Sequence, residues 1–404
     1  MIKCNFQILA YVDEDYNNKD WYLNTCTVLS PQVVFGMLRL LIDSCGIDGG
    51  DIYVGDPVKY FTKPYYDLCN EKYPNVHYLS YKHEQGREAP EYTDTAAFFS
   101  SDGIISNILP KIYLDAEYAI NLAVLKTHES AGVTSCAKNH FGTLALPSTT
   151  SASHLHYSLP NYNDEIPGYR VLVDIMGHDC LGRKTVLFLV DGLWGGGGSK
   201  GGAVPPVKWK MPPFNNDYPS SVFVSQDAVA IESVCYRLCK AEFPGLFTTA
   251  LSSGVEDYLL QAADSSYRPK DLVYDPEKDN SPIAGSLGVF EHWNNAADKQ
   301  YSRNLSIGNG IELIKVVNTA TPLPVGSTNA KALQNTLAFS VYPNPASCVA
   351  TIEPLNGGAF YSITNMAGKR LKKVMCLGKN QWLTYLYWHQ AYIFFNQWNP
   401  AANR

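Results

Sequence analysis

The stretch TVLFLV, residues 185–190, is apolar after its first residue and runs directly into Asp191 and Gly192. An uninterrupted apolar run of this length is typical of a strand that is buried on both faces of a sheet. Residues 118–125, YAINLAVL, have the same character. Strands of this kind occur mainly in parallel sheets that helices cover on both sides.

Segments with helical spacing of apolar residues alternate with these strands through residues 1–320. The first follows Ser30 and Pro31, a favourable N-cap and first-turn pair, and ends at Gly46. Further helices are predicted over residues 64–72, 134–144, 168–176 and 227–240, and further strands over 5–12, 51–57, 76–81 and 221–224. We therefore expect an α/β fold with a mostly parallel sheet and helices on both faces. Ligands of such sheets bind beyond the carboxyl ends of the strands.

The character of the sequence changes near residue 320. We expect an α/β domain over residues 1–318, a linker rich in Pro, Gly, Ser and Thr over 319–335, and a small all-β, sandwich-like module over 336–404. Because the chain opens directly in a strand, we also expect the natural protein to extend beyond this N-terminus.

The composition excludes several classes of protein. The 404 residues include 27 Tyr, 16 Phe and 7 Trp and only 17% charged residues, which excludes bulk disorder. A net charge of -6 excludes the basic field of a nucleic-acid-binding protein. No apolar run reaches the roughly 18 residues of a transmembrane helix, and the start does not resemble a signal peptide. The 10 cysteines form no Cys-x-x-Cys pair, so we expect no iron–sulfur cluster.

Two motifs bring cationic groups to the end of a predicted strand. LKTH occupies residues 125–128 and KNHFG occupies 138–142. Lys126 and Lys138 could hold a carboxylate or phosphate, with Asn139 donating amide hydrogen bonds. His128 could act as a general acid or base, because an unperturbed histidine titrates near about pH 6.5. The alternative is a solvated strand end with an internally bonded histidine.

A glycine-rich segment, WGGGGSKGG, follows Asp191. Successive backbone amides in such a loop can bind an anion, so Gly196, Gly198 and Lys200 are candidate ligand contacts, and residues 195–202 a candidate lid. The alternative is a flexible flap without a ligand. Asp191 is a candidate catalytic residue or cation ligand.

Asp227 begins a predicted helix in the motif SQDAVAIESV, residues 225–234. It is a candidate acid or base, and with Asp191 it could bind a divalent cation through oxygen ligands. The alternative is an ordinary N-cap.

The segment GVFEHWNN, residues 288–295, places an acid, a base, an aromatic ring and an amide side by side. Glu291, His292, Trp293 and Asn294 would suit a sugar or another polar ligand. The alternative is a capped surface turn with a packed tryptophan.

Together LKTH, KNHFG, VLFLVDG and SQDAVAIESV, in this order, resemble the family called domain of unknown function 362, over roughly residues 1–315. GVFEHWNN and YSRNL, residues 301–305, resemble a subgroup of secreted, Bacteroidetes-type proteins. The resemblance implies a fold and a candidate site, but no reaction. Some members carry a ferredoxin-like module, which the absence of Cys-x-x-Cys argues against here.

The tail resembles a type IX secretion (Por) C-terminal sorting domain. VYPNPAS, residues 341–347, is similar to its opening, and ITNMAGK, residues 363–369, to its middle strand and turn. This resemblance implies export to the cell surface or the medium, with the type IX machinery as partner. The stretch from Trp382 departs from the expected final hairpin, as a frame error or divergence would explain.

These observations lead to two hypotheses about function. The first is an exported enzyme that acts on a small anionic or polar substrate, with His128, Asp191 and Asp227 as catalytic residues. The second is a non-catalytic surface protein that binds a glycan or another small ligand. The first hypothesis requires Lys126, His128, Asp191 and Asp227 to meet in one crevice.

Overall fold

The computed structural model describes residues 1–6, 27–83, 85–144, 152–197 and 204–316, and six strands between residues 339 and 396. The chain divides into two units. The first comprises Met1–Arg39, Ile47–Ala320 and Ala391–Pro400, and the second comprises Leu40–Gly46, Thr321–Gln390 and Ala401–Arg404.

The first unit is built on a mixed sheet with the strand order β3-β2-β1-β6-β8-β9. Five of these strands are parallel: β1 (Ile2–Cys4), β2 (Tyr53–Gly55), β3 (His77–Leu79), β6 (Ala119–His128) and β8 (Thr185–Gly196). The other two pairings are antiparallel, those of β9 (Ser221–Ser225) with β8 and of β7 (Gly132–Thr134) with β6. The predicted mostly parallel sheet is confirmed.

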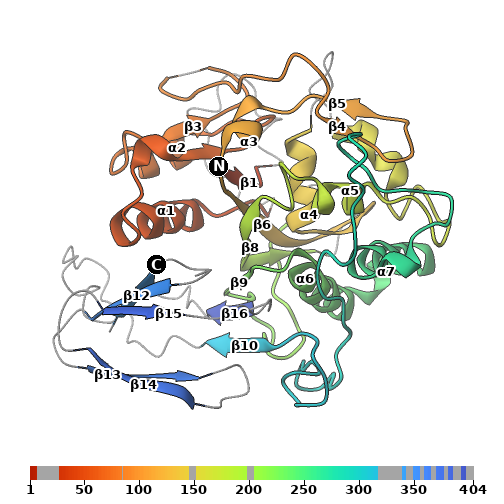
Figure 1. The fold of residues 1–404 in the computed structure, drawn as a ribbon. Helices are drawn as coiled ribbons and strands as arrows, with labels where there is room; N and C mark the ends of the chain where they lie inside the picture. The colour runs from red at the N-terminus through yellow and green to blue at the C-terminus, as the bar shows by residue number, and fades with distance from the viewer. Residues whose placement is uncertain are drawn as a thin grey trace. The chain divides into compact units, whose positions relative to one another are not determined.

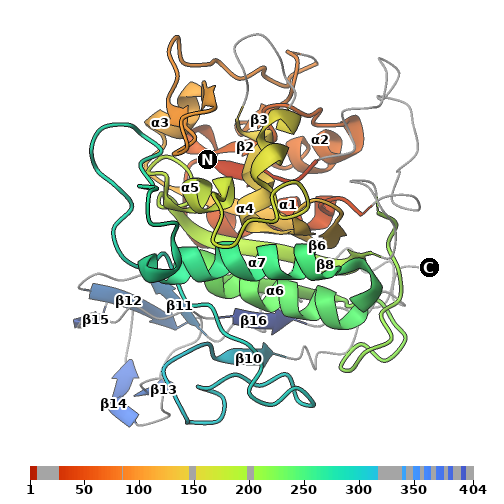
Figure 2. The ribbon, with the colours of Figure 1, turned by 90° about the vertical axis from the view of Figure 1, so that its right-hand side faces the viewer.

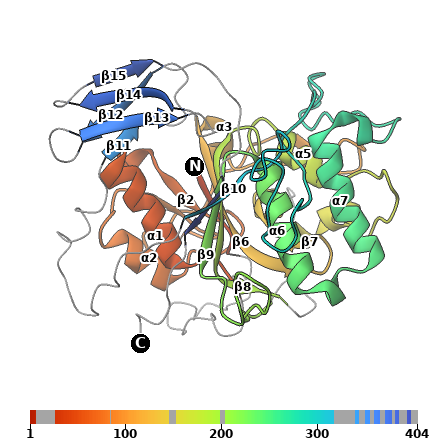
Figure 3. The ribbon, with the colours of Figure 1, turned by 90° about the horizontal axis from the view of Figure 1, so that it is seen from below.

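Helices cover both faces of this sheet (Figures 1 and 3). One face carries α1 (Pro31–Arg39), continued by a π-helical turn over Leu40–Ser44, and α2 (Lys63–Asn70). The other carries α4 (Cys136–Asn139), α5 (Val171–Gly177), α6 (Ala228–Glu242) and α7 (Thr249–Ala263), of which α6 and α7 lie side by side (Figure 2). The predicted α/β class is therefore confirmed.

Alternation along the strands sends successive side chains to opposite faces. Ala123 and Leu125 of β6 join the large apolar core together with Val190 of β8 and Val234 of α6. Shorter elements flank this core: α3 (Lys111–Asp115), the two-stranded pair β4 (Phe98–Phe99) and β5 (Ser106–Asn107), and β10 (Leu313–Val316), which pairs in parallel with β16 (Ile393–Asn396).

Three elements differ from their predicted form. The strand predicted to end at Val190 continues as β8 to Gly196, so the first glycines of the glycine-rich segment extend the sheet. The helix predicted over 134–144 is only α4 and a following 3-10 turn over His140–Gly142, because Thr134 pairs with Lys126 in β7. The strand predicted over 5–12 is β1, which ends at Cys4, and residues 7–26 lie outside the described part of the chain.

The second unit contains strands that pair antiparallel: β11 (Phe339–Tyr342) with β12 (Val349–Pro354), β12 with β15 (Gln381–Thr384), and β13 (Ala359–Thr364) with β14 (Arg370–Cys376). These agree with the predicted all-β character of the tail. No helix in the described residues is long and apolar enough to span a membrane.

Candidate functional site

The carboxyl ends of the parallel strands collect polar side chains from distant parts of the sequence. Lys126 and His128 occupy the end of β6, Asp191 lies in the second half of β8, and Asp56 directly follows β2. All four are buried. A buried charge is costly unless it is paired or hydrogen-bonded, so the partners of each group indicate its role.

Lys126 and Asp191 both bind the segment that leads into α1. The Nζ atom of Lys126 donates to the carbonyl of Thr27 at 2.9 Å. The Oδ2 atom of Asp191 accepts from the amide of Ser30 at 2.7 Å, and its Oδ1 atom accepts from the amide of Leu193 at 2.9 Å. Burial raises the pKa of Asp191, and these hydrogen bonds oppose the shift. Asp191 therefore holds the backbone at Ser30, before α1, and at Leu193 in place.

His128 is held as a neutral ring. Its Nδ1 atom accepts from the amides of Ser130 and Ala131 at 3.0 and 3.2 Å, which leaves the proton on Nε2. The ring stacks on His156, with centroids 5.9 Å apart. Burial, with the charges of Lys138, His156 and Lys126, lowers the pKa of His128 well below its usual value. Within the described residues, Nε2 has no hydrogen-bond partner, so it can donate to a ligand.

Lys138 lies on α4 and is partly buried. Its Nζ atom lies 3.8 Å from the centroid of the Phe141 ring, and among the described residues it has no ion-pair or hydrogen-bond partner. Burial, and then the charges of Lys126, Lys59 and Lys3, lower the pKa of Lys138 to about 7. A lysine whose pKa is lowered this far is a candidate functional group, because strongly shifted groups cluster at functional sites.

Ring contacts link Lys138 to His128, since the Lys138 amine lies on the Phe141 ring, Phe141 packs against His156, and His156 stacks on His128. The charge of Lys126 acts on both other groups, and the charge of Lys138 acts on His128. Phe141 bridges them, since its ring contacts the Lys138 amine and packs edge-on against His156 at 5.4 Å.

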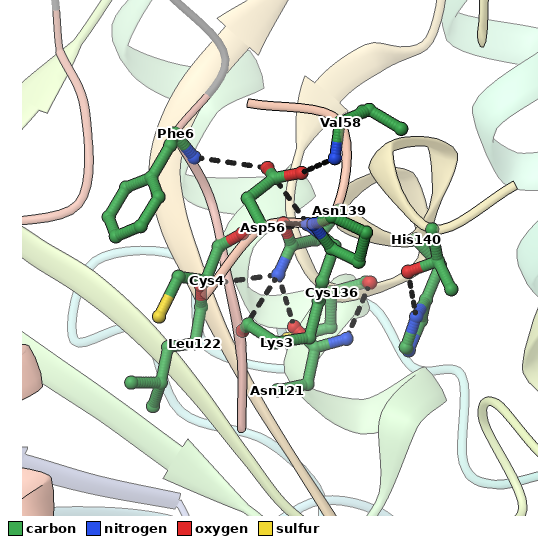
Figure 4. A network of polar contacts seen from close by, with 12 residues as sticks. Lys3, Cys4, Phe6, Asp56, Val58, Asn121, Leu122, Cys136, Asn139 and His140 are labelled. Atoms are coloured by element: carbon green, nitrogen blue, oxygen red, sulfur yellow. Dashed lines mark hydrogen bonds and ion pairs between the residues drawn. The ribbon is translucent and has the colours of Figure 1, made fainter. Parts of the chain in front are cut away.

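Asn139 belongs to a polar network with Lys3, Asp56 and Asn121 (Figure 4). Its Nδ2 atom donates to Oδ1 of Asn121 at 2.9 Å and to the carbonyl of Leu122 at 3.2 Å, and its Oδ1 atom accepts from Lys3 at 3.1 Å. The amide group is therefore used within the protein. The expectation that it donates to a ligand is not supported by this geometry.

Lys3 is the centre of the same network. Its Nζ atom donates to Oδ2 of Asp56 at 3.0 Å and to the carbonyl of Cys4 at 2.7 Å, in addition to Asn139. All three ammonium hydrogens are satisfied, so the network ties β1, β2 and α4 together. Sequence reasoning missed Lys3 and Asp56. A charged residue inside an otherwise apolar strand was the available signal.

His140 follows Asn139 and is also buried. Its Nδ1 atom lies 3.4 Å from Oγ1 of Thr143, and within the described residues its Nε2 atom has no partner. Burial chiefly, with the charges of Lys3 and His178, lowers the pKa of His140 to about 3. This ring therefore stays neutral near pH 7.

Gly196 lies against the segment held by Lys126. A Cβ atom on Gly196 would lie 2.3 Å from Oγ1 of Thr27. The close approach of β8 to the segment Thr27–Ser30 thus explains the glycine without any ligand. Gly198 and Lys200, together with most of the candidate lid, lie outside the described residues.

Asp227 lies beyond the opposite end of β8 from Asp191, because β9 runs antiparallel to β8. Val222 pairs with Asp191, whereas Ser225, the last residue of β9, pairs with Phe188, three residues or about 10 Å back along β8. Its Oδ1 atom accepts from the amide of Ala230 at 2.8 Å, as an N-cap does, and its Oδ2 atom accepts from the amide of Val289 at 2.9 Å. The structure therefore does not bring Asp227 to the predicted site.

The separation of the two aspartates bears on the expected divalent cation. Asp191 and Asp227 are too far apart to share one ion. No group of three His, Cys, Asp or Glu side chains in the described part of the chain is arranged to hold a metal.

The segment 288–295 packs on α6, where the hydroxyl of Ser233 donates to the carbonyl of Glu291 at 2.8 Å. The Glu291 carboxylate accepts from the amides of Ser302 at 2.9 Å and Ile311 at 2.7 Å, and from Asn294 Nδ2 at 2.6 Å. These groups therefore stabilise the loop itself.

The Trp293 ring and the His292 imidazole also contact charged side chains. The Trp293 ring is approached by Arg237 at 5.2 Å and Lys299 at 4.8 Å, and Nε2 of His292 lies 3.7 Å from Oε1 of Glu256. The contacts match the capped turn with a packed tryptophan, and the structure does not bring this segment together with Lys126, His128 and Lys138.

Comparisons with known proteins give one match. A search of curated proteins and a search of solved structures found none. The family described as Domain of unknown function (DUF362) matches residues 18–237, more than half of the chain, a range that includes Lys126, His128, Lys138 and Asp191. The chain belongs to the domain of unknown function 362 family.

Proposed function

We propose that the α/β domain is an enzyme that acts on a small anionic substrate, a carboxylate or a phosphate, at the carboxyl ends of β6 and β8. One observation carries this proposal. None of the described residues supplies the Lys138 amine with a counter-ion, and the positive charges of Lys126, Lys59 and Lys3 act on it. A bound anion would complete the electrostatics of this cluster.

Each group then has a distinct role. Lys138 and Lys126 attract the anion, and Nε2 of His128 donates a hydrogen bond to it. Asp191 acts indirectly, because it fixes the segment whose Thr27 carbonyl holds the Lys126 amine. A purely non-catalytic ligand-binding protein is the competing function, and it would use the same cations.

The experiment is a calorimetric titration of the purified protein with phosphate, acetate and citrate. We expect at least one anion to bind, and Lys138→Met to weaken its binding by about 10- to 100-fold, as for a lost charge-assisted hydrogen bond. Lys111→Met is the matched control, since Lys111 is exposed and lies 3.5 Å from Glu91. Equal affinities in the two variants would contradict the proposal. Native mass spectrometry with elemental analysis would identify a ligand that copurifies.

We also propose that residues 336–404 are a type IX sorting domain and that the natural protein is exported. The motifs VYPNPAS and ITNMAGK and the antiparallel strand pairs of the tail support this proposal. The test is expression behind a signal peptide in a bacterium with type IX secretion, with and without residues 336–404. We expect export only of the full chain. Equal retention of both forms in the cell would contradict it.

A further inference from the structure

The residues on either side of Lys138 are held by side chains from other elements. Before it, the amide of Ala137 donates to Oε1 of Glu232 at 2.8 Å. After it, Nδ2 of Asn139 donates to Oδ1 of Asn121 at 2.9 Å (Figure 4). The backbone that carries Lys138 is therefore fixed on both sides by groups that lie far away in the sequence.

The helix α4 is too short to hold its own shape. It spans Cys136–Asn139, and a first helical turn is unfavourable by itself, because many dihedral angles are fixed for one hydrogen bond. Within the described residues, the side chain of its N-cap residue, Ser135, makes no hydrogen bond that caps the turn. Glu232 of α6 supplies such a bond, because it accepts from an amide of the first turn.

Glu232 is itself buried and held in place. Its second oxygen, Oε2, accepts from the hydroxyl of Tyr258 on α7 at 3.0 Å. A buried carboxylate is costly unless its oxygen atoms are hydrogen-bonded, and both oxygens of Glu232 are used in this way. Two packed helices, α6 and α7, thus fix the acceptor that holds the Ala137 amide.

We propose that Glu232 is a positioning residue of the anion site, because its carboxylate caps α4 and thereby sets the place of the Lys138 amine. This inference rests on the proposed function, which assigns Lys138 to the anion, and it adds a residue that touches no ligand. The role depends on the length of the side chain, which brings Oε1 to the Ala137 amide. It does not depend on the charge, since an amide oxygen accepts the same hydrogen bond.

Two conservative substitutions distinguish length from charge. Glu232→Gln keeps the length and the acceptor and loses the charge, whereas Glu232→Asp keeps the charge and is shorter by one methylene group. In calorimetric titrations with phosphate, acetate and citrate, we expect Glu232→Gln to bind within about threefold of the wild type and Glu232→Asp about 10-fold more weakly, as for a lost N-cap. Equal affinities of the two variants, or weaker binding by Glu232→Gln, overturn the inference.

Hydrogen exchange measured by NMR reads the same contact without a ligand. The amide of Ala137 should exchange about 10-fold faster in Glu232→Asp than in the wild type, and at nearly the wild-type rate in Glu232→Gln. Unchanged exchange in Glu232→Asp overturns the inference, whether or not an anion binds.

Leu251→Ala controls for a general loss of stability. Leu251 is buried on α7 and, among the described residues, lies outside the large apolar core that contains Ala137. We expect this variant to have a lower Tm and the anion affinity of the wild type. If it weakens anion binding as much as Glu232→Asp does, affinity follows stability alone and the positioning role is overturned.

The outcomes separate this inference from the anion site itself. Weaker binding by Lys138→Met with unchanged exchange in Glu232→Asp keeps the anion site and overturns the role of Glu232. Faster exchange in Glu232→Asp with unchanged affinity overturns the placement of the anion at Lys138. Circular dichroism establishes that each variant is folded. If Glu232→Asp is not, Tyr258→Phe replaces it, because it frees Oε2, and unchanged exchange of the Ala137 amide then counts against the inference.

Discussion

Lys126 and Asp191 hold the two ends of one four-residue segment in front of α1. Lys126 donates to the carbonyl of Thr27 at 2.9 Å, and Asp191 accepts from the amide of Ser30 at 2.7 Å. A cation on β6 and a carboxylate on β8 thus fix the backbone that borders the candidate site. Neither contact was visible in the sequence, where Thr27 and Ser30 lie about a hundred residues or more from both partners.

Removal of the Asp191 carboxylate should destabilise the fold. Asp191→Ala leaves the amides of Ser30 and Leu193 unpaired, and we expect the free energy of unfolding in urea to fall by about 2–5 kcal/mol. Asp191→Asn keeps one carbonyl acceptor, so its loss should be smaller. Equal stabilities of the alanine variant and the wild type would show that the two amides do not depend on Asp191.

The buried pair of Lys3 and Asp56 should show strong coupling. Lys3→Met leaves the Asp56 carboxylate without its cation, and Asp56→Asn leaves the Lys3 ammonium without its anion, so each single change should cost about 3–5 kcal/mol. The double variant should cost less than the sum of the two by about 1–3 kcal/mol. Equilibrium unfolding of the four proteins measures the cycle, and additive losses would mean that the ion pair contributes no coupling.

Local pattern was enough to predict the parallel sheet. The apolar runs at 118–125 and 185–190 became neighbouring parallel strands, and Ser30 with Pro31 marked the start of α1. Thr134 of β7 pairs with Lys126, and α4 begins two residues later, so the helix that carries Lys138 starts near the end of β6. Short-range connections of this kind can be inferred from one sequence.

The direction of β9 could not be inferred in this way. A buried parallel strand and a buried antiparallel strand have the same apolar pattern, so SVFV, residues 221–224, was compatible with both. The antiparallel direction places Asp227 beyond the opposite end of the strands from Asp191. Asn139 was misjudged for a related reason, since its partner Lys3 lies 136 residues away. Long-range pairing decides which polar groups are used within the protein.

A methyl group at Gly196 should destabilise the fold whether or not a ligand is bound, because it would lie too close to Thr27. Gly196→Ala would bring a Cβ atom to within 2.3 Å of Oγ1 and 2.8 Å of Cβ of Thr27, so we expect a loss of about 1–3 kcal/mol in unfolding free energy. Gly245→Ala is the control, because nothing lies within 4 Å of its added methyl group. If both variants lose the same stability, the close approach of Gly196 to Thr27 is not what requires the glycine.

Two substitutions of His128 should distinguish the roles of its two ring nitrogen atoms. Asn places an acceptor near the position of Nδ1, so His128→Asn should keep the bonds from Ser130 and Ala131 and lose only the Nε2–H donor. We expect its stability to remain within about 1 kcal/mol of the wild type. Because the anion loses the hydrogen bond from Nε2–H, its affinity should fall by about 10-fold.

His128→Gln is the matched variant. It keeps a donor near Nε2 but leaves the amides of Ser130 and Ala131 without their acceptor, so we expect it to be less stable by about 1–3 kcal/mol. Chemical denaturation and calorimetric titration with the anion check both variants. Unchanged anion affinity in His128→Asn at full stability would contradict a hydrogen bond from Nε2 to the anion.

The depressed pKa of Lys138 should appear in the pH dependence of stability. The folded-state pKa is about 7, whereas the unfolded amine has its ordinary value of 10.5. Between these values the unfolded chain binds a proton that the folded protein has released, so the free energy of unfolding rises with pH by at most about 1.4 kcal/mol per pH unit from this group. Above the unfolded pKa both states are neutral, and below the folded pKa the cost of the buried charge is complete.

The difference between the wild type and Lys138→Met isolates this contribution, because the other titrating groups cancel. We expect the wild type to gain stability relative to the variant as pH rises from about 7 to about 10, measured by urea unfolding at each pH. Lys111→Met, which removes an exposed lysine, should keep a constant difference from the wild type over the same range. Parallel stability curves for the wild type and Lys138→Met would mean that the pKa of the Lys138 amine is not lowered in the folded protein.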